Sequence, residues 1–143
     1  MIARPWAPKV KAGDIVQCRF PEDRLGAPGP KDRPAVVLEV ETDPEDESAI
    51  IVRVAYGTSQ DVERRYPGEF TVRATDAQAG LDRDTKFDLG NTMRLPFDSE
   101  WFTPSPNRRF GEHPKRGALN LDDQKLKRAL HAAIVEAKEA GRL

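Results

Sequence analysis

The chain has 143 residues, with 23 Lys and Arg, 24 Asp and Glu, two His and one Cys. A chain of this length supports one hydrophobic core, and a single Cys excludes a disulfide framework or a paired-cysteine metal knuckle. No apolar stretch approaches the roughly 20 residues that span a bilayer, and the N-terminus lacks the apolar segment of a secretory signal. We therefore expect one soluble, cytoplasmic domain over residues 1–143.

Short runs of apolar and β-branched residues predict strands through the first two thirds of the chain. These runs cover residues 15–20, 34–40, 49–56, 69–72, 85–89 and 91–96. The run at 34–40 is nearly continuous in apolar residues, which predicts burial on both faces. Gly90 separates the last two runs and predicts a bulge or a tight bend there.

The C-terminus carries the one clear helical pattern. Apolar residues follow the spacing of a single helix face at Leu126, Leu130, Ala133, Ile134 and Ala137. Asn120 or Asp122 can cap the N-terminus and Gly141 can end the helix, so we expect it over about 121–140. A Pro-rich loop over 103–118 precedes it. Five or six short strands followed by one amphipathic helix predict a mainly β fold, a small barrel or curled sheet with the helix packed on it.

Three motifs follow one another in the N-terminal half. Gly-Asp-Ile-Val at residues 13–16 opens the first strand, and Arg-Pro at 33–34 begins a strongly apolar strand after a glycine-containing loop. The third apolar run ends in a Gly-Thr-Ser turn at 57–59. In this order the motifs resemble the PemK/MazF family of bacterial toxins, over about residues 13–102. The resemblance implies an SH3-like barrel, usually a homodimer, that cleaves single-stranded RNA without a metal or other cofactor and is neutralised by an antitoxin protein.

The resemblance points to Arg33 as a catalytic residue, and we expect Thr58, a nearby hydroxyl, to be the second. In RNA cleavage the ribose 2′-OH attacks the adjacent phosphate, and a planar guanidinium can stabilise the doubly charged phosphorane through two parallel hydrogen bonds. Arg33 suits this task because it lies where a loop enters a buried strand; the alternative is an ordinary surface arginine before a proline. Arginine is a poor proton carrier because its pKa exceeds about 12, so the general base stays unassigned.

Further residues around these two are candidates for holding RNA. By the simplest alignment the catalytic Thr of the family falls nearest Tyr56, and the hydroxyls of Thr58 and Ser59 come two and three residues later. Either hydroxyl could donate to a phosphate oxygen, although Gly-Thr-Ser also suits an ordinary turn. Tyr56 could stack on an unpaired base or be a half-buried strand aromatic. Phe20 and Arg24 flank the first loop and could form a wall of the groove.

Other reactive residues favour structural interpretations. His113 and His131 lie far from the candidate loops in sequence, and Cys18 alternates with strand residues as a core side chain would. No group of His, Asp and Glu has the spacing of metal ligands. A basic patch around Phe110 is most simply a solvated loop; it comprises Arg108, Arg109, Lys115 and Arg116.

The charge distribution leaves room for a cationic groove despite a net charge of −1. Six acidic residues fall between Glu39 and Glu47, whereas arginines lie in or near the candidate strand ends and loops at positions 24, 33, 53, 64 and 65. Two alternatives to an RNase remain. One is a non-catalytic barrel of the same fold that binds a protein or nucleic acid, such as a phage or plasmid accessory protein. The other is a CcdB-like gyrase poison, although the chain lacks the C-terminal Trp of those toxins.

Overall fold

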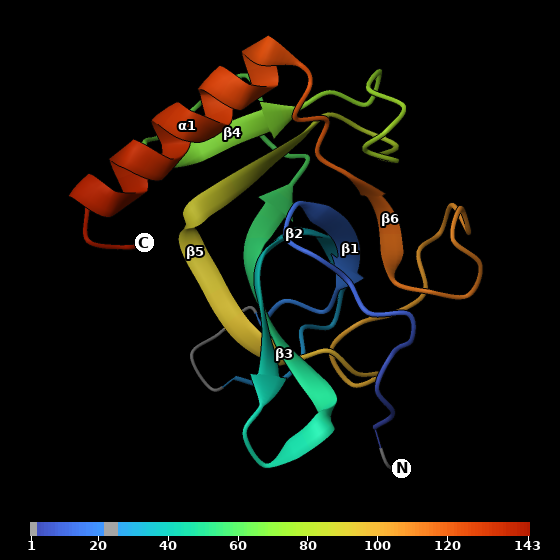
Figure 1. Cartoon of the computed structure of the whole chain (residues 1–143). Helices are drawn as coiled ribbons and strands as arrows, with labels where there is room; N and C mark the ends of the chain where they lie inside the picture. Colours follow the sequence, from blue (N-terminus) through green and yellow to red (C-terminus); the bar gives the residue numbers. More distant parts are fainter. Residues whose placement is uncertain (1–2, 22–25) are drawn as a thin grey trace.

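A computed structural model of the chain describes residues 3–21 and 26–143. Within these residues six strands precede one helix (Figure 1): β1 Asp14–Cys18, β2 Arg33–Asp43, β3 Asp46–Thr58, β4 Glu69–Val72, β5 Thr85–Pro96, β6 Lys115–Ala118 and α1 Gln124–Glu139. This order of elements confirms the predicted mainly β fold with a C-terminal helix. Arg24, a predicted groove residue, lies outside the described residues.

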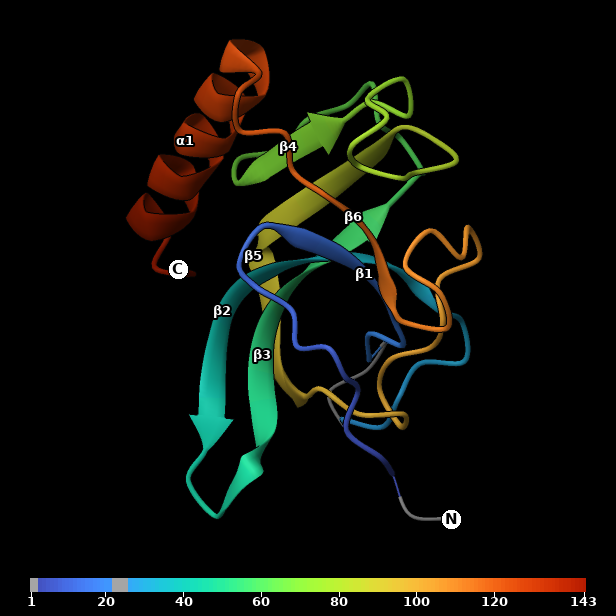
Figure 2. The same cartoon turned by 45° about the vertical axis from the view of Figure 1, so that its right-hand side comes forward.

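The six strands form one antiparallel sheet in the order β4-β5-β3-β2-β1-β6. Figures 1 and 2 both place α1 beside β4 at one edge of the sheet, and β6 beside β1 at the other. The long β2–β3 hairpin extends away from the helix (Figure 2). None of the described helices is long and apolar enough to cross a membrane.

Two strands differ from the sequence-based expectation. The predicted runs at 85–89 and 91–96 join into the single strand β5, which bulges at its middle because Ala55 pairs with Thr92 whereas Tyr56 pairs with Asp88. The expected loop over 103–118 is wrong in its last part, since β6 pairs there with β1. A strand of four residues that follows a proline and begins with two cations carries no apolar pattern, so only its partner strand reveals it.

The sheet is buried on both faces, and each face has its own core. Ile15 and Val36 belong to the core beneath α1, whereas their neighbours Val16 and Val37 belong to the core on the opposite face. This arrangement confirms the expected two-sided burial at Ala35, Val36 and Val37, whereas Glu39 and Val40 at the end of the same run are exposed. It also makes the middle of the sheet rigid, so that the strand ends hold fixed positions.

The helix packs on the sheet through the predicted apolar stripe. Leu126, Ala133 and Ala137 are buried, and the helix lies against β4 and β5. Its N-cap is Asp123, whose side chain accepts hydrogen bonds from two helical N–H groups; the expected caps at Asn120 or Asp122 are therefore wrong. The side chain of Asn120 instead accepts from the N–H of Asp122, which forms the turn before the helix.

Candidate functional site

Adjacent strands bring Arg33 and Thr58 to the same end of the sheet. Arg33 begins β2 and Thr58 ends β3, the neighbouring antiparallel strand. The two backbones approach closely here, since a Cβ atom at Gly57 would lie 2.4 Å from the carbonyl oxygen of Pro34. Only glycine allows this approach, so the residue before Thr58 is part of what sets its position beside Arg33.

Arg33, Thr58 and Ser59 line one cleft of about 230 Å³. An adjoining hollow of about 280 Å³ is lined by Phe20, Tyr56 and again Arg33, with Pro21 and Asn91. Arg33 therefore stands between the two spaces. Among the predicted site residues that the structure describes, all five line this continuous surface.

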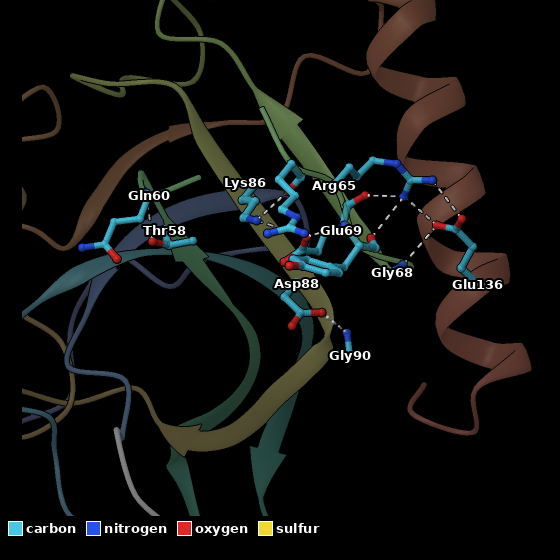
Figure 3. Close-up of polar contacts among 11 residues, drawn as sticks. Thr58, Gln60, Arg65, Gly68, Glu69, Lys86, Asp88, Gly90 and Glu136 are labelled. Atoms are coloured by element: carbon cyan, nitrogen blue, oxygen red, sulfur yellow. Dashed lines mark hydrogen bonds and ion pairs between the residues drawn. The ribbon is translucent and has the colours of Figure 1, made fainter. Parts of the chain in front are cut away.

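The two predicted catalytic side chains have free hydrogen-bonding capacity. The Thr58 hydroxyl oxygen accepts from the Gln60 N–H at 3.1 Å (Figure 3), which leaves the hydroxyl proton able to donate to a ligand. Within residues 3–21 and 26–143, no hydrogen bond or ion pair occupies the Arg33 guanidinium. A partly buried arginine without an anionic partner, beside a hydroxyl donor, is suited to bind a phosphate or another oxyanion.

The aromatic pair beside Arg33 can present one ring face. Phe20 is buried, and its ring lies edge-on to the Tyr56 ring with centroids 5.4 Å apart. Tyr56 is only half-buried. Phe20 therefore supports Tyr56, and Tyr56 is the ring that a base could reach.

The cleft also contains a residue that the sequence interpretation assigned to a solvated patch. Arg116, on β6, is buried, and its guanidinium bonds to Gln17, Gly80 and Asp82. The other patch members are separate from it: Lys115 pairs with the buried Asp14, and Arg109 donates to the backbone carbonyl of Ala77. Arg116 reaches the cleft because β6 pairs with β1. The sequence does not indicate this pairing, because β6 has only four residues, two of which are cations.

The other reactive residues are structural, as expected for Cys18 and His113. His113 is buried, its Nδ1 accepts from the Lys115 N–H, and its Nε2 lies 2.7 Å from the Pro8 carbonyl. Burial raises the pKa of the Cys18 thiol and keeps it un-ionised. His131 is exposed on α1. The described part of the chain has no cluster of three His, Cys, Asp or Glu side chains able to hold a metal ion.

A second polar cluster extends from β4 and β5 through the loop before β4 to the helix (Figure 3). Lys86 is buried, 3.3 Å from the Glu69 carboxylate, and donates to the Arg64 carbonyl at 2.8 Å. Arg65 forks onto Glu136 at 2.7 and 2.8 Å, and its hydrogen bond holds the pKa of Glu136 at about 2. We call these four side chains, Lys86, Glu69, Arg65 and Glu136, the helix-side cluster.

Comparison with protein families agrees with the motifs and the fold. The family model described as PemK-like, MazF-like toxin of type II toxin–antitoxin systems matches residues 11–97, more than half of the chain. The matched segment contains the predicted site residues and all strands except β6. Comparison with curated proteins finds no match. The chain belongs to the PemK-like, MazF-like toxin family of type II toxin–antitoxin systems.

Proposed function

We propose that this toxin is an endoribonuclease that cleaves single-stranded RNA in the cytoplasm and is neutralised by a cognate antitoxin. One observation carries the proposal: in a chain of this toxin family, Arg33 and Thr58 line one cleft, with a guanidinium that no described residue pairs and a hydroxyl proton that is free to donate. A single strand fits such a site better than a duplex does, because the cleft offers few cations and the protein has a net charge of −1.

The reaction is an internal transesterification. The ribose 2′-oxygen forms a bond to the adjacent phosphorus, and the proton of the 2′-OH passes to a general base. The bond from phosphorus to the 5′-oxygen breaks, and the leaving 5′-oxygen takes up a proton from a general acid or from water. The products are a 2′,3′-cyclic phosphate and a 5′-hydroxyl, so the reaction itself requires no metal. Arg33 donates to the non-bridging oxygens, where negative charge increases in the transition state, and Thr58 donates to one of them.

The neighbouring hollow would hold the strand. Tyr56 stacks on an unpaired base beside the scissile phosphate, supported by Phe20, and Ser59 extends the polar rim of the cleft. An antitoxin segment that covers the same surface would block RNA entry. We also propose that the toxin is a homodimer, the usual assembly that the family resemblance implies.

The test is cleavage of a mixed-sequence single-stranded RNA in the presence of EDTA. The wild type is expected to cleave, and Arg33→Ala is expected to lose about 100-fold or more in rate, as for removal of a main oxyanion donor. Arg94→Ala is the matched control, since Arg94 is exposed on β5, pairs with Glu41 and lies outside the cleft. An inactive wild type, or equal rates for wild type and Arg33→Ala, would contradict the proposal.

Growth of bacteria that express each protein distinguishes the remaining functions. The proposed RNase slows growth, and Arg33→Ala relieves the effect. A folded wild type that leaves growth unchanged would favour a non-catalytic binding module. Growth arrest without RNA cleavage, together with inhibition in a supercoiling assay, would favour a gyrase poison.

A further inference from the structure

Arg116 is a buried cation at the wall of the proposed RNA cleft. Only 4% of its side chain is exposed, although it lines the same space as Arg33 and Thr58. Its Nε donates to the Gly80 carbonyl at 3.1 Å, and one terminal nitrogen donates to the Gln17 side chain at 2.8 Å. These contacts fix the guanidinium plane, because the Gln17 amide is itself buried and donates to Asp32 at 2.6 Å.

The third partner of Arg116 is of a different kind. The second terminal nitrogen lies 3.2 Å from the carboxylate of Asp82, whose side chain is 75% exposed on the loop before β5. A buried guanidinium needs an anionic or polar partner, whereas an exposed carboxylate is well solvated without one. The Asp82 carboxylate can therefore leave at little cost, provided that another anion takes its place on Arg116.

A phosphodiester matches the vacated position in charge and geometry. Carboxylate and phosphate oxygens accept from guanidinium N–H groups in the same way. The strand order places Arg116 on β6 and Arg33 on β2, on either side of Gln17 in β1. Arg33, Gln17 and Arg116 therefore lie on three adjacent strands, and an RNA strand held at Arg33 would bring a further phosphate to Arg116.

We propose that Arg116 is a second phosphate-binding residue of the cleft and that Asp82 occupies its free side until an RNA phosphate replaces the carboxylate. The inference rests on the proposed function, and it adds a binding subsite and a built-in competitor to it. Arg83, exposed on the same cleft, adds positive charge beside this subsite. In this arrangement the Asp82 carboxylate limits RNA affinity, and it also keeps the buried Arg116 paired in the free protein.

The test measures binding of a mixed-sequence single-stranded 2′-O-methyl RNA, which cannot be cleaved, by fluorescence anisotropy. Asp82→Asn is expected to bind about three- to tenfold tighter than the wild type, since one competing exposed charge is removed. Asp122→Asn is the matched control, because it makes the same charge change at an exposed site outside the cleft. Equal affinities for Asp82→Asn and Asp122→Asn would overturn the inference.

A double-mutant cycle assigns the effect to Arg116. Arg116→Lys keeps the charge but loses the planar fork, so it is expected to weaken binding about tenfold and to abolish the gain from Asp82→Asn. A gain that persists in the Arg116→Lys background would overturn the assignment. Should Arg116→Lys fail to fold, the comparison of Asp82→Asn with Asp122→Asn still decides.

Cleavage of unmodified RNA in EDTA by the wild type separates the two proposals. A wild type that cleaves, with no gain from Asp82→Asn, contradicts the Arg116 subsite alone. A wild type that neither cleaves nor binds RNA contradicts the proposed function, and the subsite with it.

Discussion

Two groups of cations on this sheet differ in how completely they are paired. In the helix-side cluster Lys86 contacts Glu69, and Arg65 forms two hydrogen bonds with Glu136. In the cleft, Arg33 has no ionic or hydrogen-bonding partner among the described residues. One terminal nitrogen of the Arg116 guanidinium pairs with the exposed carboxylate of Asp82. Charges that are satisfied within the protein hold its parts together, whereas an unsatisfied cation in a cleft is available to a ligand.

The helix-side cluster accordingly joins three segments of the chain. Glu136 on α1 accepts from Arg65 and also from the Gly68 N–H at 3.0 Å, and Arg65 donates to the Glu69 carbonyl at 2.9 Å. The loop before β4 is thereby fixed to the helix (Figure 3). Among residues 3–21 and 26–143, no comparable set of contacts crosses the cleft from Arg33, so its loss should leave the fold intact.

The largest expected effect is on stability, from Lys86→Met. This change leaves the nearly buried Glu69 carboxylate without its cation, and breaking a buried pair in this way costs about 3–5 kcal/mol. Arg33→Met, the same substitution in the cleft, should change the free energy of unfolding by less than about 0.5 kcal/mol. Urea unfolding of both variants measures the difference. Similar losses for the two would remove the distinction between the groups.

The next effect is on cleavage, from Thr58→Val. Valine keeps the shape but removes the hydroxyl donor, and a hydrogen bond to a charged group is worth about 1.5–3 kcal/mol, or roughly 10- to 100-fold in rate. Thr58→Ser should retain most of the rate. Single-turnover cleavage by Thr58→Val and Ser59→Ala then shows which hydroxyl the reaction uses. A larger loss for Ser59→Ala would move the catalytic role to Ser59.

The positions of Arg33 and Thr58 at strand ends could be predicted from the residues next to them in the sequence. Arg33 precedes a buried apolar strand and Thr58 follows another, and two adjacent antiparallel strands must bring such ends together. Gly57 marks the close approach of those strands. The sequence therefore named both residues as candidates, and the observed pairing of β2 with β3 places them on one surface.

Arg116 could not be predicted in the same way. It reaches the cleft because β6 adds to the free edge of β1, a pairing between segments about 100 residues apart in the chain. Neither segment indicates the other, since Lys115 and Arg116 give β6 a polar sequence. The N-cap was missed for a local reason: three polar residues, Asn120, Asp122 and Asp123, can each cap a helix, and only the backbone conformation selects Asp123.

The smallest expected effect tests the exposed part of the helix-side cluster through pH. The hydrogen bond from Arg65 lowers the pKa of Glu136 from 4.5 to about 2 in the folded protein, so the ionised carboxylate stabilises the fold above the unfolded pKa. That contribution is lost as the pH falls from about 5 to about 2. Glu136→Gln should therefore lower the melting temperature slightly at pH 7, and the melting temperature of the variant should fall less steeply than that of the wild type over this pH interval.

Asp84 also has a lowered pKa, chiefly because its carboxylate accepts from the Ala74 N–H, so the melting temperatures of both proteins keep part of their pH dependence. Glu139→Gln, an exposed carboxylate on the same helix, provides the charge-matched control, and equal pH profiles for the two variants would show that the Arg65 pair adds nothing to stability.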